Sequence, residues 1–137
     1  MTVAVIDTGI DLTHPDLAST VVASVNCDNP ALSPNDGNGH GTHVAGTIGA
    51  INNNFGVVGV SNQVNLAAVK VLSDNGGGSW SGVICGIDWV TSNAPTYNIK
   101  VANMSLGGGG SSDNNCGLSN SDALHRALCN SAAAGIT

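Results

Sequence analysis

The segment Val3-Ala4-Val5-Ile6-Asp7-Thr8-Gly9 determines the expected fold of this chain. Its first four residues form a short apolar run rich in β-branched side chains, which is typical of a buried strand. Asp-Thr-Gly follows at the carboxyl end of this strand, where a loop is expected. A strand buried on both faces requires helices above and below the sheet, so the rest of the chain should supply them.

The remainder of the chain alternates between strand and helix patterns. Further strands are expected at residues 21–25, 64–72 and 101–106, and a surface loop over residues 26–39. Helices are expected over residues 40–51, on the stripe Val83, Ile87 and Val90, and around Leu124, Ala127, Leu128 and Ser131. Asn120 or Ser121 would cap the last helix, and Gly135 would end it.

This alternation predicts an α/β fold with three layers, in which a mostly parallel sheet carries helices on both faces. Ligands of such sheets bind beyond the carboxyl ends of the strands. Asp7 and the loops at residues 76–78 and 105–110 lie at these ends. The candidate functional residues should therefore be found there.

The charge balance excludes several classes of partner. The chain has 137 residues with three basic and nine acidic side chains, the acidic ones all Asp, and a net charge of -6. Without a cluster of Lys and Arg there is little to neutralise phosphates, so neither a nucleic acid nor an anionic membrane surface is expected as a partner. No apolar run reaches the roughly 18 residues of a membrane span, so no span is expected.

The four cysteines, Cys27, Cys85, Cys116 and Cys129, are compatible with two disulfides formed in an oxidising compartment. No Cys-x-x-Cys pair occurs, which argues against a zinc site. Three pairings are open. Cys116 and Cys129 could form a local bridge, and Cys27 and Cys85 could pair with each other or with cysteines in the remainder of the domain, although Cys85 could also be buried and free. With a surface rich in Asn, Ser, Thr and Gly, this favours a secreted protein, although no signal peptide is expected ahead of the first strand.

Two short segments carry residues suited to acid–base chemistry. Asp7 stands at the end of a strand, and His40 stands at the start of a helix, in the segment Asn38-Gly39-His40-Gly41-Thr42-His43. In a Ser-His-Asp system the Asp fixes the tautomer of the imidazole, while the His acts as general base. Neighbouring strand ends and helix starts at one edge of a parallel sheet allow the two side chains to meet. Taken singly, Asp7 could instead cap a loop and His40 a helix.

Three ordered motifs make the combination specific: residues 5–9 around Asp7, residues 40–47 around His40, and residues 103–108 with the sequence Asn-Met-Ser-Leu-Gly-Gly. In order and spacing they resemble the subtilisin-like serine proteases, or subtilases, and similarity without gaps also runs over residues 47–59. The resemblance implies that Asp7 is the catalytic Asp and His40 the catalytic His. It also implies that His43 is a structural residue packed behind the site.

The resemblance further implies a cleft for a polypeptide substrate. The residues concerned are Ser105, Leu106 and Gly107 on one wall, and Gly76, Gly77 and Gly78 on the other. Exposed backbone groups bind extended peptides, and glycine lets the peptide backbone approach closely. Trp80 would lie at the rim of an apolar subsite, which favours bulky apolar side chains, although an ordinary half-buried aromatic residue is the alternative.

A structural calcium site is also implied by the resemblance. Its ligands would be the carboxylate of Asp16, the side-chain oxygen of Asn53 and the backbone carbonyls of Ile51, Phe55 and Val57. Calcium prefers several oxygen ligands, and the carbonyls of a tight turn supply them without adding charge. A plain Asn-rich turn is the alternative, and the residues that provide a further ligand in the family are missing here.

The chain lacks the segment that would hold the nucleophile. A subtilase needs a Ser in a Gly-Thr-Ser-Met-Ala segment and an Asn that donates to the oxyanion, and neither segment occurs in residues 1–137. Ser105 and Ser111 are no substitutes, because neither lies in a strand-to-helix elbow. Residues 1–137 are therefore expected to be a partial subtilase catalytic domain that is inactive by itself and needs the remainder of the domain.

Other functions fit parts of the sequence. Asp-Thr-Gly is also the signature of aspartic proteases, which are largely β-structured and would here require a dimer, since the motif occurs once. A non-catalytic module of the subtilase type could hold peptides in the same cleft without cleaving them. A metal site on His40 and His43 is a third alternative, although their i, i+3 spacing and the lack of a Glu disfavour it.

Overall fold

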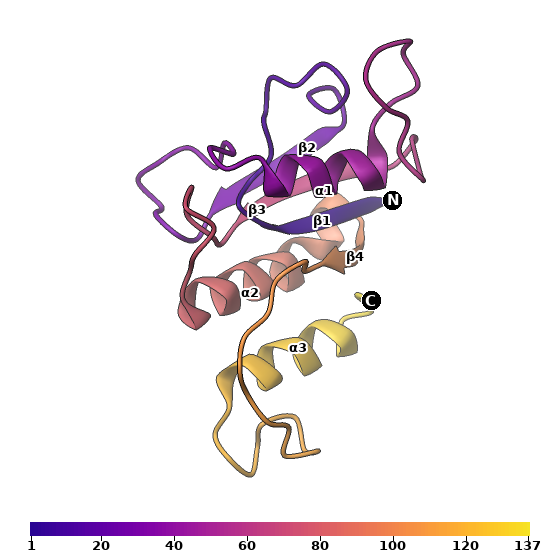
Figure 1. Ribbon diagram of the computed structural model, residues 1–137. Helices are drawn as coiled ribbons and strands as arrows, with labels where there is room; N and C mark the ends of the chain where they lie inside the picture. The colour runs from indigo at the N-terminus through magenta and orange to yellow at the C-terminus, as the bar shows by residue number, and fades with distance from the viewer.

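The computed structural model describes all residues 1–137 and has three layers (Figure 1). The strands are β1 (Thr2–Asp7), β2 (Val21–Asn26), β3 (Asn65–Lys70) and β4 (Ile99–Asn103). The helices are α1 (His40–Gly49), α2 (Trp80–Tyr97) and α3 (Ala123–Ala133). Figure 1 shows α1 on one face of the sheet and α2 and α3 on the other side, so the expected α/β fold is confirmed.

The four strands are parallel and follow the order β2-β3-β1-β4. β1 therefore lies inside the sheet, and all of its residues are buried, as its apolar run predicts. The register pairs Asp7 at the end of β1 with Lys70 at the end of β3. Asp7 thus emerges at the carboxyl edge of the sheet, between the strands whose following loops can approach it.

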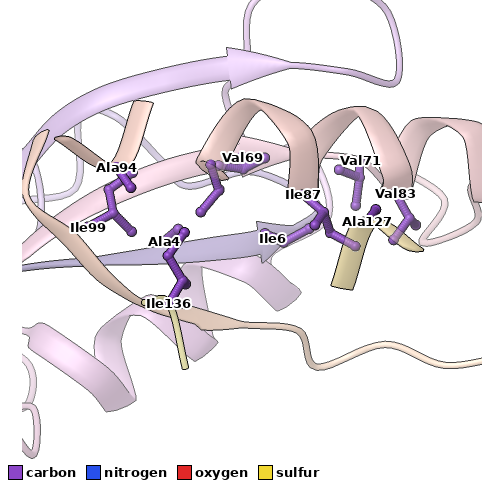
Figure 2. Close-up of a cluster of buried hydrophobic side chains, with 12 residues drawn as sticks. Ala4, Ile6, Val69, Val71, Val83, Ile87, Ala94, Ile99, Ala127 and Ile136 are labelled. Atoms are coloured by element: carbon purple, nitrogen blue, oxygen red, sulfur yellow. The ribbon is translucent and has the colours of Figure 1, made fainter. Parts of the chain in front are cut away.

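Alternate residues of β1 pack in opposite directions. Ala4 and Ile6 belong to a core cluster with α2 and α3 (Figure 2), whereas Val3 and Val5 belong to a second cluster on the side of α1. This period of two divides the apolar side chains of the sheet between two cores. Each fully buried Val or Ile contributes about 1.5–3 kcal/mol, so the end of β1 is held firmly from both faces.

One strand boundary departs from the sequence-based expectation by three residues. β4 ends at Asn103 instead of residue 106, and residues 104–122 form an irregular segment that contains four consecutive glycines, Gly107 to Gly110. Glycine weakens a strand because it loses more backbone freedom on folding and offers no side chain to pack. The other expected boundaries of strands, and those of α1, agree to within two residues.

The expected cap of α3 is wrong. Asp122 is the N-cap instead of Asn120 or Ser121, and its Oδ1 accepts hydrogen bonds from the N–H groups of Leu124 and His125. A charged acceptor is favoured at this position because the first N–H groups of a helix carry partial positive charge. The expected end is correct, since Gly135 follows the helix with a φ of 81°.

Both disulfides connect loops to helices. Cys27, just after β2, is bonded to Cys85 of α2, and Cys116 of the 104–122 segment is bonded to Cys129 of α3. This is one of the three pairings that the sequence allows, and it includes the expected local bridge. Cys85 is therefore not a free thiol, and the two bridges fit an extracellular protein. None of the helices combines the length and apolar character needed to cross a bilayer.

Candidate active site

Asp7 and His40 meet at the carboxyl edge of the sheet. Nδ1 of His40 lies 2.7 Å from Oδ1 of Asp7, which also accepts a 2.7 Å hydrogen bond from the N–H of Thr8. The Asp7 side chain is fully buried, whereas 49% of the His40 side chain is exposed. Because a carboxylate only accepts hydrogen bonds, this contact places a ring proton on Nδ1 and leaves Nε2 free to accept another.

Side chains from outside the helix hold the start of α1. Its N-cap, Gly39, has a left-handed φ of 101° and no side chain to cap the helix. The N–H groups of His40, Gly41 and Thr42 donate instead to Oδ1 of Asn38, Oγ1 of Thr8 and Oδ2 of Asp36, over 3.2, 2.9 and 2.9 Å. A helix leaves its first four N–H groups without intrahelical partners, so this arrangement satisfies most of them and fixes His40 in place.

Asp36 accepts five hydrogen bonds, all from donors close to the site. The donors are the hydroxyl of Thr8, the N–H groups of Asn38, Gly39 and Thr42, and the hydroxyl of Thr42, over 2.6–3.0 Å. Burial favours the neutral carboxyl group, but the hydrogen bonds outweigh burial and lower the pKa of Asp36 to about 2.

Sequence reasoning misses Asp36, because residues 26–39 are expected only as a surface loop. The signal that could have revealed it is the run Asp36-Gly37-Asn38-Gly39 directly ahead of a helix. Asp and Asn are the usual acceptors for the first N–H groups of helices, and glycines between them allow the tight turns required.

Glycine allows α1 to approach the end of β1 closely. A Cβ atom on Gly41 would overlap the carbonyl oxygen of Gly9, and a Cβ atom on Gly9 would overlap the carbonyl oxygen of Pro34. Gly9 also has a φ of 108°, a conformation that other residues rarely adopt. Contact between Asp7 and His40 therefore depends on the absence of side chains at both positions.

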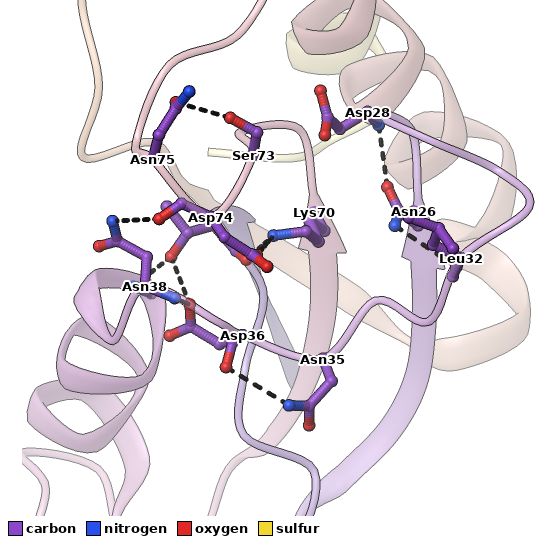
Figure 3. Close-up of polar contacts among 12 residues, drawn as sticks. Asn26, Asp28, Leu32, Asn35, Asp36, Asn38, Lys70, Ser73, Asp74 and Asn75 are labelled. Carbon is purple, nitrogen blue, oxygen red and sulfur yellow. Dashed lines mark hydrogen bonds and ion pairs between the residues drawn. The ribbon is translucent and has the colours of Figure 1, made fainter.

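Lys70 connects the end of β1 to the loop after β3, and Figure 3 shows its contact with Asp74 on that loop. Its buried Nζ donates to the carbonyl oxygen of Thr8 over 2.6 Å and to Oδ1 of Asp74 over 2.8 Å. Nδ2 of Asn38 donates to the carbonyl oxygen of Asp74 over 2.9 Å, which joins the loop before α1 to the same group. The hydrogen bond from Lys70, followed by its positive charge, lowers the pKa of Asp74.

The role of Lys70 also escapes sequence reasoning. A single Lys at the end of a strand is usually solvent-exposed, because Lys is rarely buried unless it is paired. Here the side chain is 6% exposed. Asp74 lies only four residues further along the chain, but the carbonyl of Thr8 is 62 residues away and is brought to Lys70 only by the fold.

A cleft of about 370 Å³ is lined by His40 together with all the residues expected to bind substrate. These are Gly76, Gly78 and Trp80 from the loop after β3 and the start of α2, and Ser105, Leu106 and Gly107 from the segment after β4. The indole of Trp80, 43% of which is exposed, packs so closely on Gly108 that a Cβ atom there would overlap the ring. The two expected walls therefore belong to one cleft, and Trp80 lines the same cleft.

His43 does not lie where the resemblance implies. Its side chain is exposed, so the expectation that it packs behind the site is wrong. The buried face of α1 is formed by Gly41, Ala45 and Gly49 at intervals of four residues. With about 3.6 residues per turn, His43 lies roughly opposite this face and points away from the sheet.

Asp16 and the loop after α1 are in contact. The Asp16 side chain is buried; its Oδ1 accepts from Nδ2 of Asn53 over 3.0 Å, and its Oδ2 accepts from the N–H of Val57 over 3.3 Å. The N–H of Ile51 donates to the carbonyl oxygen of Asp16, and that of Phe55 donates to Oδ1 of Asn53. No salt bridge involves Asp16, so it is a buried carboxylate without a counter-charge, and the loop groups that contact its oxygens are the nitrogen donors of Asn53 and Val57.

Two of the alternative functions do not fit this geometry. An aspartic protease needs two carboxylates that share a proton, whereas Asp7 contacts an imidazole at the edge of a parallel sheet. A metal site on His40 and His43 would need further ligand side chains beside the two imidazoles. The structure has no group of three or more His, Cys, Asp or Glu side chains placed to hold a metal ion.

Known proteins resemble this chain over most of its length. The subtilase family model matches residues 1–136. The chain is 52% identical over 111 residues to subtilisin amylosacchariticus of Bacillus subtilis subsp. amylosacchariticus, covering 77% of this chain and 26% of that protein. It is 43% identical over 134 residues to subtilisin DY of Bacillus licheniformis, covering 98% of this chain and 43% of that protein.

Among solved structures, a cold adapted subtilisin-like serine proteinase matches 99% of this chain and 44% of its own length, with a TM-score of 0.80 and 39% identity. The chain thus spans between about a quarter and less than half of the length of these relatives. The match to the family over almost every residue, together with the shared fold, shows that this chain belongs to the subtilase family.

Proposed function

We propose that this chain carries the Asp and His of a serine endopeptidase of the subtilase class, in which Asp7 orients His40 and His40 is the general base. The nucleophilic serine would come from a Gly-Thr-Ser-Met-Ala segment outside these 137 residues. The observation that supports the proposal is the 2.7 Å contact between Nδ1 of His40 and Oδ1 of Asp7 beside a peptide-sized cleft.

The proposed chemistry follows from the exposure of the two side chains. Nε2 of His40, on the solvent-accessible ring, would take the proton of the serine hydroxyl as the serine attacks the peptide carbonyl. The buried Asp7 carboxylate, whose Oδ2 has no hydrogen-bond partner, would stabilise the imidazolium that forms. His40 would then return the proton to the leaving amine, and a second cycle with water would release the product acid.

The proposed substrate is an extended polypeptide. Gly76, Gly78 and Gly107 leave backbone groups of the cleft accessible, so a peptide can pair with them as an added strand. Ser105 and Leu106 belong to the same wall as Gly107. Trp80 contributes an exposed indole to the lining of the cleft, which suits a bulky apolar side chain of the substrate.

Hydrolysis of a chromogenic peptide tests this proposal. The 137-residue chain alone should show no turnover, because it lacks the nucleophile segment. A polypeptide in which the chain continues into that segment should hydrolyse the peptide, and a serine-directed covalent inhibitor should abolish the activity. Peptide binding without turnover in this longer polypeptide would favour the non-catalytic module instead.

A matched pair of variants on α1 sharpens the test. His40→Ala should abolish turnover, whereas His43→Ala, which removes an exposed imidazole one turn along the same helix, should leave kcat within about twofold of the original value. Equal losses in the two variants would argue against a specific role for His40. Turnover by the 137-residue chain that the inhibitor abolishes would contradict the predicted need for the remainder of the domain.

We also propose a structural calcium ion at Asp16, held by its carboxylate, the side-chain oxygen of Asn53 and the carbonyls of Ile51, Phe55 and Val57. Support comes from the buried, uncompensated carboxylate and from its contacts with Asn53 and Val57 of the loop whose oxygens would bind the ion, because calcium prefers oxygen ligands. Bound calcium would neutralise this charge and stabilise the loop, with no part in the chemical step.

Isothermal titration of the folded chain with calcium tests this site. Binding should occur in the unchanged chain and in Asp88→Asn, which alters an exposed carboxylate on α2, but should be lost in Asp16→Asn. Absence of binding in the unchanged chain would refute the calcium proposal.

The two disulfides further support secretion as the proposed localisation, since such bridges persist in oxidising compartments.

A further inference from the structure

We propose that Asp36 is a positioning residue that sets the distance and orientation between Asp7 and His40. This inference rests on the proposed function of that pair. Asp36 does not line the cleft that His40 shares with the substrate-binding residues, so it does not contact the substrate there. It would act through residues close to Asp7 and His40 in the chain, namely Thr8, Asn38, Gly39 and Thr42.

Asp36 reaches the buried member of the pair through Thr8. The hydroxyl of Thr8 donates to Oδ1 of Asp36 over 2.9 Å and accepts the N–H of Gly41 over 2.9 Å. The N–H of Thr8 donates over 2.7 Å to Oδ1 of Asp7, which is the oxygen that also contacts His40. Thr8 is 1% exposed, so water cannot replace these hydrogen bonds of Thr8 without movement of the backbone.

Asp36 reaches the exposed member of the pair through Thr42. Oδ2 of Asp36 accepts both the N–H and the hydroxyl of Thr42, over 2.9 and 2.6 Å, two residues after His40 in the first turn of α1. Oδ1 accepts the N–H groups of Asn38 and Gly39, which lead into the helix. One carboxylate therefore holds the end of β1 and the start of α1 at the same time.

The chemistry of the donors requires a carboxylate at this position. Each oxygen of Asp36 faces at least one backbone N–H group, from Asn38 and Gly39 on one side and from Thr42 on the other. A hydroxyl group can reverse its role, but a backbone N–H cannot accept. An Asn side chain would place its NH₂ group against an N–H donor in either orientation, so Asp36→Asn must disturb one of the two connections.

Lys70 and its partner Asp74 contact two of the residues that Asp36 binds, Thr8 and Asn38. Nζ of Lys70 donates to the carbonyl oxygen of Thr8, and Asp74 accepts Nδ2 of Asn38 through its own carbonyl (Figure 3). Figure 3 shows Asp36 and Asn38 on the strand-to-helix connection, with Lys70 at the end of β3 and Asp74 on the loop that follows it. The low pKa of Asp36 agrees with a carboxylate that stays ionised in this setting.

Proton NMR of the 137-residue chain provides a test that does not depend on peptide hydrolysis. The Nδ1 proton of His40, in its short bond to Asp7, should give a resolved low-field signal, which Asp7→Asn identifies by removing it. Asp36→Asn should broaden this signal beyond detection or move it upfield by about 1 ppm or more. The matched control is Asp113→Asn, which removes a carboxylate that also accepts three backbone N–H groups, in the 104–122 segment.

The control should leave the His40 signal unchanged, and circular dichroism should show that each variant is folded. If Asp36→Asn does not fold, Thr8→Val removes the hydroxyl that connects Asp36 to the N–H of Gly41, with both of its hydrogen bonds, and should alter the signal. Thr8→Ser, which keeps the hydroxyl, should retain the signal. An unchanged signal in a folded Asp36→Asn variant, or in Thr8→Val, would overturn the proposal. So would an equal change in Asp113→Asn, since that would reflect general destabilisation.

In a polypeptide that also carries the nucleophile, Asp36→Asn should lower kcat about tenfold or more with KM within about twofold, because misplacement of a base affects the reaction rather than substrate binding. A rise in KM alone would contradict a positioning role. Absence of turnover in the unchanged polypeptide would refute the proposed protease function, while the NMR result would still decide whether Asp36 positions the pair.

Discussion

Nδ1 of His40 lies 2.7 Å from Oδ1 of Asp7, and the two side chains differ in exposure, 49% for the imidazole and 0% for the carboxylate. The sheet fixes the carboxylate, and the capped start of α1 fixes the ring. This difference matters chemically, because the orienting group must be immobile and shielded while the base must reach a second reactant. The fold thus separates the two requirements between a strand end and a helix start.

Replacement of Asp7 by Asn should lower kcat about 10⁴-fold in a polypeptide that carries both this chain and the nucleophile. An amide can hold the ring in the wrong tautomer and cannot stabilise the imidazolium, and losses of this size are known for the orienting Asp of a serine protease triad. Steady-state hydrolysis of a chromogenic peptide measures the effect. Asp88→Asn on α2 is the control, and a loss below tenfold for Asp7→Asn would contradict the assigned role.

Gly41→Ala should separate Asp7 from His40 and destabilise the fold by about 2–3 kcal/mol. The added Cβ atom would overlap the carbonyl oxygen of Gly9, and backbone atoms cannot move aside as a flexible side chain can. Gly46→Ala on the same helix is the matched control, because its Cβ atom would meet nothing within 4 Å. Urea denaturation should show the control unchanged or stabilised by up to about 1 kcal/mol; equal effects would refute the argument.

Much of this fold follows from local patterns in the sequence. The apolar run before Asp7 and the periodic stripes of the helices predict a parallel α/β sheet because burial on both faces leaves a strong hydrophobic signal. Asp7, His40 and the glycine-rich walls follow from three ordered motifs. The end of β4 and the cap of α3 were harder to predict, because several Asn, Ser and Asp residues near residue 120 could each cap a helix.

The polar groups that support the site could not be predicted in the same way. Asp36 and Thr8 are separated by 28 residues, and Lys70 and Thr8 by 62, so their contacts depend on the completed fold. Likewise, the exposed side chain of His43 follows from which face of α1 packs on the sheet, where Gly41 and Gly49 are buried. Single-residue patterns carry no information on such nonlocal partners.

Loss of the Cys27–Cys85 disulfide should destabilise the chain more than loss of Cys116–Cys129. The first bridge closes a sequence separation of 58 residues and the second one of 13, and a longer loop restricts the unfolded chain more. The chain-entropy relation gives about 4 kcal/mol and about 3 kcal/mol, respectively. Urea denaturation of the two double Cys→Ser variants checks the order; a larger loss for the Cys116–Cys129 pair would contradict it.

Acid should destabilise the fold partly through Asp36. Its pKa in the folded state, about 2, lies below the ordinary value of 3.8, so ionisation stabilises the fold. This contribution is fully present above about pH 4 and is lost as the pH falls toward about 2. Since the carboxyl group is partly solvated, the contribution is on the order of 1 kcal/mol rather than the full value of the shift.

Unfolding free energies measured between about pH 5 and pH 2 check this prediction. Asp36→Asn should show a shallower decline than the unchanged chain, because its side chain does not titrate. The remaining decline reflects other carboxyl groups with lowered pKa values, such as Asp74, which accepts a hydrogen bond from Lys70. Parallel pH profiles for the two proteins would show that Asp36 contributes nothing to acid stability.

Trp80→Ala should raise KM about tenfold for peptides with a bulky apolar side chain at the subsite next to the indole, with little change in kcat. The exposed indole packs on Gly108 and lines the cleft with Leu106, so its loss removes apolar contact area that binds substrate and transition state alike. Kinetics with a peptide series that varies only this side chain measure the effect in a polypeptide with the nucleophile.

Peptides with Ala at that position should lose little affinity, and Trp80→Phe should retain most of the preference because it keeps an aromatic ring. A uniform rise in KM across the series, or an unchanged KM in Trp80→Ala, would assign Trp80 to packing of the cleft walls rather than to substrate recognition.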